Sequence, residues 1–498
     1  MKLQWKSSPL DCLAPALQQI QQRELTQELK LPEEMPDVGR VLGAWGQGMV
    51  RSKQWQSDTV GCSGGVMVWV LYAPEDGTAP QVLDGWVPFQ MTWDLPEGTK
   101  EGSLRIDCLV RFADARSVSP RKLMLRLGVA VSAEVFSPTT CQVCQPGEVP
   151  PEVELLKNTY PMTLSREAGE KIFLLDEEVP FPEGAVPEKI LYYTLNPRIT
   201  DKKVLTRKVV FRGLGNLHVL GMGPDGGLES WDFEVPFSQF EELTQDHSGE
   251  AQVDFRLCLT SAEVELTGEG NLRLKCGLTA QYRITDRAMV ELVEDAYSPG
   301  RELEIAWEEL AVPALLEAKG ETVAIEQTVP GQIQRVADVS FLPDPVGMEK
   351  TGDSLALNFS GTAQVLGYDG DGQLQSTTNW WERRETMPCH EKARMFPGLP
   401  TAAGVTGQTV AEGVCVKAEL PLSWMASALE QLPQVAGLEL GAEKSRSADA
   451  PSLILRRAGG ERLWDIAKKT GSTVTAITQA TGLEGEPSPN QMLLIPVK

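Results

Sequence analysis

The residues that could carry out chemistry are few and scattered along the chain. The 498 residues include three histidines, His218, His247 and His390, which fall in different surroundings. Cys389 and His390 are neighbours in sequence, but adjacent residues in a loop rarely face each other as a nucleophile and its base must. The sequence contains no P-loop, G-x-S-x-G or H-E-x-x-H motif. We therefore expect no catalytic residues and a protein that is not an enzyme.

One glycine-rich stretch matches the dinucleotide fingerprint G-x-G-x-x-G. It reads Gly221-Met222-Gly223-Pro224-Asp225-Gly226 and is followed by a strand-like run rather than a helix. A pyrophosphate would need the positive end of a helix dipole at this point. We therefore interpret the stretch as a hairpin turn and expect no cofactor. His218, just before it, is expected to be a surface or bulge residue.

The cysteines favour a reduced protein without a metal site. The chain has nine, and Cys141-Gln142-Val143-Cys144 is the one C-x-x-C pair. Zinc would need a second pair or nearby histidines, and neither follows. We expect Cys141 and Cys144 to be free thiols in a linker. Four others, Cys108, Cys258, Cys276 and Cys415, lie in apolar strand-like runs, where a reduced cysteine acts as a small hydrophobe.

The charge balance limits the partners. Lys plus Arg number 46 and Asp plus Glu 69, a net charge of −23. Nucleic acids and anionic membrane surfaces bind basic footprints, so neither is an expected partner. By contrast, residues 451–498 hold six basic and four acidic side chains. A basic tail on an acidic body suits docking on an acidic partner, although a solvated face explains the same pattern.

The first thirty residues carry no apolar signal-peptide core, and no window approaches the length of a transmembrane helix. We therefore expect a cytoplasmic protein without transmembrane insertion.

The chain repeats itself over long distances. Two marks recur with the same offsets, 149 and then 146 residues. They are Arg40-Val41, Lys189-Ile190 and Arg335-Val336, and Leu71, Leu220 and Leu366. In each copy a strand-like run ends in an Asp-Gly turn, a strong hairpin signal. Alternating apolar and polar runs then follow, as in half-buried strands.

These patterns predict a mainly β fold with three consecutive antiparallel sandwich-like or barrel-like repeats and a small βααβ domain. We expect a helical segment at 1–30, centred on the polar stretch Pro15 to Leu29, and a linker at 441–450. The repeats are expected at 31–140, 152–297 and 302–440, the third divergent, and the small domain at 451–498.

The C-terminal segment carries the most specific pattern. Leu463-Trp464-Asp465-Ile466-Ala467 and Leu493-Leu494-Ile495-Pro496 resemble the two halves of a LysM domain. The resemblance implies two short helices on a two-stranded sheet, with loops that bind N-acetylated sugars. The Asp-Thr usual in the first loop is here Glu461-Arg462, and the usual Asn after the second helix is here Thr481. These departures weigh against the glycan ligand.

The three repeats resemble SPOCS domains, through the basic-apolar start, the strand with its Asp-Gly turn, and Val-Pro-Phe at 87–89 and 235–237. SPOCS-type repeats followed by LysM resemble the SipL type of spore-coat morphogenetic protein. That resemblance implies a scaffold in the mother cell, at the forespore surface. Its LysM domain would bind the polymerised basement-layer ATPase, and other coat proteins are further possible partners. The implied contact residues are Gly459, Gly460, Glu461, Arg462, Trp464, Thr481 and Leu483, of which Trp464 also suits the core.

Two alternatives stay open. The tail could bind peptidoglycan or cortex while the β domains act as spacers. The β domains could instead form a hydrolase, which would require deep pockets with carboxylates of raised pKa.

Overall fold

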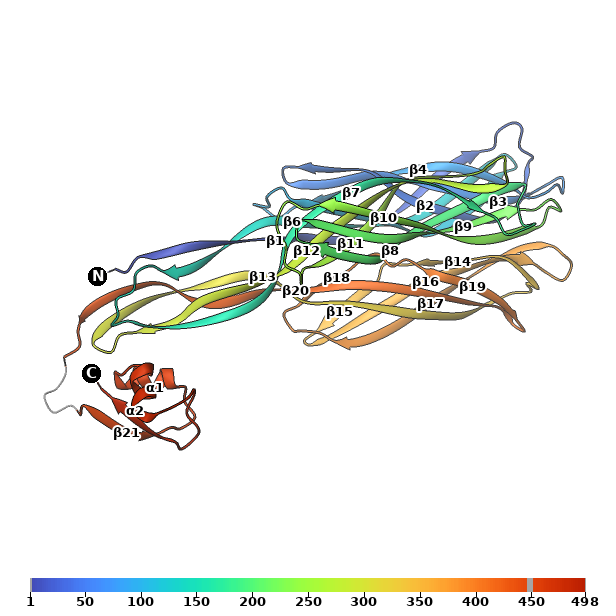
Figure 1. Cartoon of the computed structure of the whole chain (residues 1–498). Coiled ribbons are helices and arrows are strands. Elements are labelled where there is room, and N and C mark those ends of the chain that lie inside the picture. The colour runs from blue at the N-terminus through green and yellow to red at the C-terminus, as the bar shows by residue number, and fades with distance from the viewer. Residues whose placement is uncertain (1, 446–450, 498) are drawn as a thin grey trace.

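The computed structural model describes residues 2–445 and 451–497 and is mainly β, as predicted. Three consecutive segments, which we call units 1, 2 and 3, share one order of strand pairing. In each unit the first long strand pairs with the last one, and a meander of strands lies between them. A fourth segment, the C-terminal unit, contains both helices (Figure 1).

The strands of the units have the following bounds. Unit 1 comprises β1 (Trp5–Lys30), β2 (Val38–Gln56), β3 (Thr59–Pro74), β4 (Gln81–Asp94), β5 (Ser103–Ser119) and β6 (Lys122–Pro146). Unit 2 comprises β7 (Glu154–Pro180), β8 (Lys189–Leu205), β9 (Lys208–Met222), β10 (Leu228–Glu242), β11 (Gln252–Leu266) and β12 (Asn271–Tyr297). Unit 3 comprises β13 (Arg301–Pro330), β14 (Arg335–Pro343), β15 (Gly347–Thr351), β16 (Ser354–Tyr368), β17 (Leu374–Pro388), β18 (Arg394–Pro397), β19 (Ala403–Val410) and β20 (Gly413–Glu443).

The predicted N-terminal helix at 1–30 is wrong, because this segment is strand β1. It pairs with β6 from Trp5 opposite Pro146 to Lys30 opposite Lys122. Pro15, which cannot donate a backbone hydrogen bond, lies at the register shift, where a strand tolerates proline. Pairing with a strand more than a hundred residues away overrides the local helical tendency. Unit 1 therefore begins near residue 5 rather than 31.

Two of the expected linkers also differ from the structure. Cys141 and Cys144 lie inside β6, so they are part of a strand and not of a linker. β20 extends to Glu443, and residues 446–450 of the expected linker lie outside the described residues.

The predicted hairpin turns are confirmed. Gly77, Gly226 and Gly372 have φ angles of 71°, 77° and 74°, the left-handed region that glycine adopts without strain. They join β3 to β4, β9 to β10 and β16 to β17. The glycine-rich stretch at 221–226 is thus a turn followed by strand β10, as interpreted from its sequence.

A β-bulge marks the same place in each meander. The register shifts between Val41 and Gly43 in β2, and the corresponding shifts are Ile190/Tyr192 in β8 and Val336/Asp338 in β14. The residue after each shift lies opposite a leucine: Leu71, Leu220 and Leu366. Positions in the three meanders can therefore be matched residue by residue.

The matched positions form a closed ring of contacts between the units. Trp69 of unit 1 lies 6.4 Å from Tyr192 of unit 2, measured between ring centroids. At the same position in unit 2, His218 binds Asp338 of unit 3, with 2.7 Å between Nε2 and Oδ1.

Gln364 of unit 3 completes the ring by approaching Gly43 of unit 1. A Cβ atom on Gly43 would lie 2.6 Å from the Trp45 ring and 2.9 Å from Gln364 Nε2, so a larger residue would require these side chains to shift. Arg40 also donates a 2.7 Å hydrogen bond to the carbonyl of Leu374 across this third interface.

The six longest strands form a stalk that projects from the body. They pair as three ribbons, β1 with β6, β7 with β12 and β13 with β20 (Figure 1). About half of each strand packs in the cores of the body, and the other half forms the stalk, which therefore extends roughly 45 Å at about 3.3 Å per residue. The ribbons share apolar cores that include Cys12 of unit 1, Leu164 of unit 2 and Val312 of unit 3. Each unit thus supplies one side of the stalk.

Buried charges join units 1 and 2 where the stalk meets the body. Arg105 lies opposite Glu134 in unit 1, and Asp254 lies opposite Arg283 at the corresponding place in unit 2, with the charges exchanged. Arg105 Nη2 donates a 2.8 Å hydrogen bond to Asp254 Oδ2. Arg256 lies 3.5 Å from Glu134. A buried charge is tolerated only when it is paired in this way.

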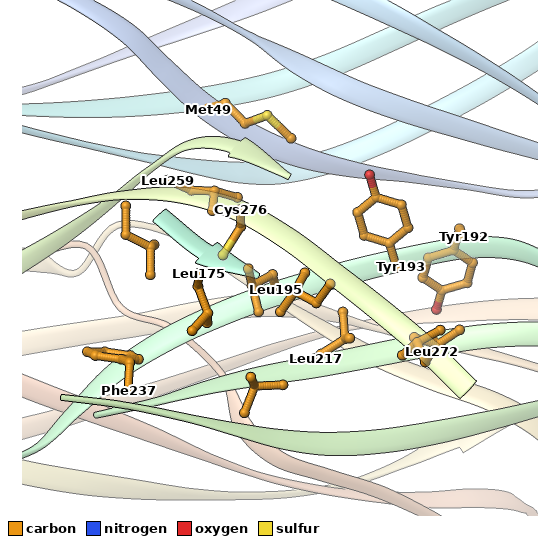
Figure 2. Packing of buried hydrophobic residues seen from close by; sticks show 14 of the residues in the cluster. Met49, Leu175, Tyr192, Tyr193, Leu195, Leu217, Phe237, Leu259, Leu272 and Cys276 are labelled. Carbon is orange, nitrogen blue, oxygen red and sulfur yellow. The ribbon is translucent and has the colours of Figure 1, made fainter. Parts of the chain in front are cut away.

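The largest apolar core lies inside unit 2 and extends into its neighbours. Figure 2 shows Leu175, Leu217 and Leu272 packed from different strands, with Tyr192 and Tyr193 beside them. Met49 of unit 1 belongs to the same cluster. No helix among the described residues is long and apolar enough to cross a membrane.

Candidate functional site

The candidate contact residues of the sequence lie in the C-terminal unit, which is strand, helix, helix, strand. Its elements are β21 (Leu453–Arg457), α1 (Leu463–Thr470), α2 (Val474–Thr481) and β22 (Met492–Pro496), and β21 pairs antiparallel with β22. Each helix ends at a glycine in the left-handed conformation, Gly471 and Gly482, where a side chain would add strain. Ile466, Ala467 and Ile477 form the unit's core between helices and sheet.

The two loops that the sequence nominated lie side by side. Glu486, from the loop after α2, accepts a 2.7 Å hydrogen bond from the backbone nitrogen of Leu463, at the start of α1. Gly459, Gly460 and Arg462 in the first loop are exposed. They form the accessible part of the candidate site.

Glu461 and Arg462 are engaged by near neighbours. Glu461 is half-buried and pairs with Arg456 and Lys469. The Arg462 guanidinium lies 3.2 Å from Asp465, and this carboxylate raises the pKa of the arginine. All three pairs are partly solvent-accessible, so a carboxylate of a partner could replace Asp465 or Glu461 at small cost.

Three other nominated residues have structural contacts. Thr481 accepts a hydrogen bond from Leu494 N at 2.9 Å and so joins the end of α2 to β22. Leu483 is buried in the core of the unit. Trp464 is also buried, at 6 % exposure, and its indole N–H donates a hydrogen bond to a residue of the stalk.

The C-terminal unit rests on the tip of the stalk through Asp295 of β12. Trp464 Nε1 donates a hydrogen bond of 2.8 Å to Asp295 Oδ2, and Lys468 Nζ lies 2.7 and 2.8 Å from the two carboxylate oxygens. Tyr297 packs edge-on against Trp464, with 4.7 Å between the ring centroids. Burial raises the pKa of Tyr297, which keeps its hydroxyl neutral.

The sequence did not predict this contact surface at the tip of the stalk, which we call the seat of the C-terminal unit. Asp295 and Trp464 are 169 residues apart, and no local pattern links them. The one available signal was charge: Glu291, Glu294 and Asp295 are acidic, and Lys468 and Lys469 are basic.

The outer face of the C-terminal sheet is apolar and open. Leu453, Leu455 and Met492 are 50 %, 64 % and 43 % exposed. The register places Leu455 opposite Leu494, so these side chains form one continuous face. The face points away from the helices, because the buried Leu493 and Ile495 alternate with it.

The three histidines have separate environments. His218, expected at the surface or in a bulge, lies in regular pairing within β9 with its ring 19 % exposed. Its two nitrogens lie 2.8 Å from Asp232 and 2.7 Å from Asp338, and Tyr192 donates to Asp338 as well. Burial alone would lower the pKa of His218, but the two carboxylates outweigh it and raise the pKa to about 10.

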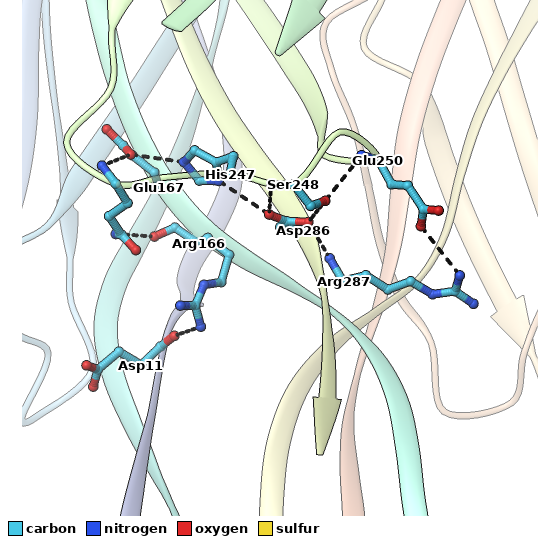
Figure 3. A network of polar contacts seen from close by, with 9 residues as sticks. Asp11, Arg166, Glu167, His247, Ser248, Glu250, Asp286 and Arg287 are labelled. Atoms are coloured by element: carbon cyan, nitrogen blue, oxygen red, sulfur yellow. Dashed lines mark hydrogen bonds and ion pairs between the residues drawn. The ribbon is translucent and has the colours of Figure 1, made fainter. Parts of the chain in front are cut away.

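His247 joins a second polar network, within unit 2 and at its border with unit 1 (Figure 3). Its Nε2 lies 3.1 Å from Glu167 of β7, and its Nδ1 lies 3.7 Å from Asp286 of β12. Neighbouring Arg166 donates to the carbonyl of Asp11 in β1 at 2.6 Å. The network fixes the loop between β10 and β11 onto both stalk strands of unit 2.

His390 accepts a 3.2 Å hydrogen bond from the backbone of Lys392 at Nδ1. Within the described ranges, no group of three or more His, Cys, Asp or Glu side chains is arranged to hold a metal ion. All nine cysteines are free thiols.

Comparisons of this chain with models of protein families, with curated proteins and with solved structures each found no match.

Proposed function

We propose that this protein is a non-enzymatic scaffold of the spore coat, in which units 1 to 3 are SPOCS-type repeats and the C-terminal unit is a LysM-type domain. Its location would be the mother-cell cytoplasm, at the surface of the forespore. There the C-terminal unit would dock on the polymerised ATPase of the coat basement layer, and other coat proteins could join through the body.

One observation carries the proposal: a small unit with accessible recognition surfaces lies at the tip of a long stalk. The shared strand order supports reading units 1 to 3 as repeats of one domain type, and the strand–helix–helix–strand order supports a LysM-type C-terminal unit. A stalk of this length would hold a docked partner at a distance from the body. Loops and surfaces on a rigid support are common sites of recognition.

The chemistry of the C-terminal unit favours a protein partner over a sugar. Leu453, Leu455 and Met492 form an exposed apolar face, of the kind that marks protein interfaces. Arg457 lies on the same side of β21 as Leu453 and Leu455, because alternate residues of a strand share a face. Arg462 is exposed nearby in sequence. The apolar face with Arg457 beside it, and the exposed Arg462 of the first loop, suit a partner that offers apolar and acidic side chains.

Co-sedimentation of the full chain with the purified, polymerised ATPase tests the proposal. We expect the chain to pellet with the polymer, and Arg462→Ala and Leu455→Asp to reduce the bound fraction at least fivefold without loss of fold. Arg116→Ala is the matched control, because Arg116 is 76 % exposed on the body and pairs with Asp114 nearby. Trp464→Ala should unfold the C-terminal unit, because it removes a buried aromatic side chain.

Calorimetric titration of the full chain with chitin oligomers and muropeptides separates the alternative. Millimolar or tighter binding that Arg462→Ala abolishes, together with no capture by the ATPase polymer, would refute the proposal in favour of a glycan-binding protein. The place where a fluorescently tagged copy accumulates during sporulation tests the location independently.

A further inference from the structure

The cleft between units 1 and 2 contains an arginine without a charged partner. Arg51 of β2 is exposed and stacks on Trp86 of β4, with 3.9 Å between its Cζ atom and the ring centroid. Among the described residues it forms no hydrogen bond and no ion pair. The register of β2 shifts between Val50 and Ser52, so Arg51 is the extra residue of a β-bulge, a feature that can redirect a side chain. The ring covers the face of the guanidinium and leaves its N–H donors available to an anion.

The cleft beside this stack has a volume of about 490 Å³. Its floor consists of buried residues from both units: Met49, Leu175, Tyr193 and Cys276. A second hollow, of about 480 Å³, shares Arg51 and Trp86 with the cleft and is otherwise lined by residues of β3 and β4. Two hollows joined in this way form a groove, which suits an extended chain better than a compact small molecule.

The unit 2 side of the groove carries two exposed aliphatic side chains. Leu174 and Ile172 of β7 are 80 % and 66 % exposed, and they share a face because alternate residues of a strand do so. Leu174 lines the cleft and is the most exposed large apolar side chain of the described residues. Adjacent exposed apolar side chains of this kind mark interaction sites.

The other units do not have this aliphatic pair. The pairing of β1 with β6 and of β7 with β12 matches Leu174 with Glu24 and Ile172 with Gln22. In unit 3 the two positions hold the glycine and the alanine at 320 and 318. The fold therefore does not require aliphatic side chains at this place, and they are specific to unit 2.

Unit 2 also shows what the arginine of unit 1 lacks. Trp86 lies opposite Met67, and the matched position in unit 2 is Glu234, opposite Asn216. Glu234 pairs with Arg198 of β8 at 3.2 Å. On this face of unit 2 a guanidinium meets a carboxylate, whereas in unit 1 it meets an aromatic ring and no carboxylate.

The other charged residues that line the cleft have a group of opposite charge beside them. Asp176 accepts two hydrogen bonds, at 2.8 and 2.9 Å, from an arginine of β12. Lys275 donates to Glu265 at 2.7 Å. Glu263 forms no ion pair among the described residues, but it lies opposite Lys275 in the ladder of β11 and β12, so a cation is already near it. Arg51 remains as the lining cation without a carboxylate, and the groove therefore suits an acidic group.

We propose that the groove between units 1 and 2 is a docking site for an extended segment of a protein partner, in which an acidic side chain stands beside aliphatic ones. The Arg51 guanidinium binds the carboxylate of the partner through its fork of N–H donors. Ile172 and Leu174 pack against the aliphatic side chains of the partner. The site lies on the body and not on the C-terminal unit, so it goes beyond the proposed function and does not depend on it.

The other units supply the variants for a test. Arg51→Thr introduces the residue that the matching bulge of unit 2 has at position 200. Ile172→Gln with Leu174→Glu introduces the two residues that unit 1 has at these positions. Met289→Gln is the matched control, because Met289 is also 66 % exposed in unit 2 but lies on the stalk. All four side chains are exposed, so the variants should unfold at the thermal midpoint of the parent.

Selection from a phage-displayed library of random dodecapeptides tests the proposal on the full chain. The library is first depleted on the Ile172→Gln/Leu174→Glu variant, which removes peptides that bind the unchanged C-terminal unit, and is then selected on the parent. We expect the surviving peptides to be enriched in Asp or Glu next to Leu, Ile or Val.

Calorimetric titration of a synthetic survivor then measures the role of each side of the groove. Arg51→Thr should weaken binding tenfold or more, and Met289→Gln should leave it unchanged. Replacing the acidic residue of the peptide by its amide should weaken binding to the parent but not to Arg51→Thr, because the two changes remove the same contact.

Three results would overturn the proposal. They are no surviving peptide that binds saturably, survivors that lack acidic residues, and equal binding of a survivor to the parent and to a folded Arg51→Thr chain. None of the three bears on capture of the ATPase polymer, which tests the proposed function separately.

Discussion

Replacing Asp295 by alanine is expected to loosen the C-terminal unit from the stalk. The Asp295 carboxylate, 17 % exposed, accepts the indole hydrogen bond of Trp464 at 2.8 Å and pairs with Lys468 at 2.7 Å. The indole bond to a charged acceptor contributes about 1.5–3 kcal/mol. Lys468 is 40 % exposed, so solvent screening limits its pair to about 1 kcal/mol or less.

The two contributions together predict a loss of about 2–4 kcal/mol in docking free energy, or roughly 30- to 700-fold in the docking equilibrium. Asp295→Asn keeps one neutral acceptor and should lose about half as much. The expected readout is the indole proton of Trp464 in a nitrogen-correlated NMR spectrum, identified by its disappearance in Trp464→Phe. Loss of the carboxylate should shift this signal upfield and speed its exchange with water.

Glu291→Gln is the matched control, because Glu291 lies on the same strand and pairs with Lys157 of the stalk. An indole signal that is unchanged in Asp295→Ala, or changed equally in Glu291→Gln, would show that Asp295 does not hold the unit. If docking on the stalk competes with the partner, Asp295→Ala should also bind the ATPase polymer more tightly.

Three further predictions concern the units themselves. His218 has its pKa raised from 6.5 to about 10, so its stabilisation is complete below pH 6.5 and is lost as the pH rises through 10. The loss is at most about 5 kcal/mol, and urea unfolding from pH 6 to 10.5 should show it in the parent and not in His218→Gln. Arg105→Met removes the hydrogen-bonded partner of the buried Asp254 and should cost about 3–5 kcal/mol, against less than about 1 kcal/mol for the exposed Arg116→Met, both measured by urea unfolding. Gly43→Ala should lower the thermal midpoint because its Cβ would lie 2.6 Å from the Trp45 ring and 2.9 Å from Gln364 Nε2. Gln364→Ala in the same chain should recover part of the loss, and no recovery would place the strain at Trp45.

Sequence patterns predicted what is local. The Asp-Gly turns before Thr78, Gly227 and Gln373 were readable because a two-residue signal determines a hairpin by itself. The recurring leucines at 71, 220 and 366 marked positions that the bulges place alike in each meander. The two short helices expected in the small domain are present as α1 and α2.

Contacts between residues that are far apart in the sequence were not predicted. The segment at 1–30 looks helical until β6, which begins at Lys122, supplies its hydrogen bonds. His218 was expected at the surface or in a bulge, because its partner Asp338 lies 120 residues later in the chain. Asp338 contacts the imidazole and helps to raise its pKa. The role of Trp464 likewise changes once Asp295 lies beside it.

Both ends of the protein emerge at the same extremity. Leu3 hydrogen-bonds to Leu438 through the backbone at 3.0 Å, and the C-terminal unit lies below this tip in Figure 1. A fusion partner at either terminus would therefore crowd the seat of the C-terminal unit. Insertion of a reporter at the Gly77 or Gly372 hairpin, on exposed turns of the body, would leave that seat clear.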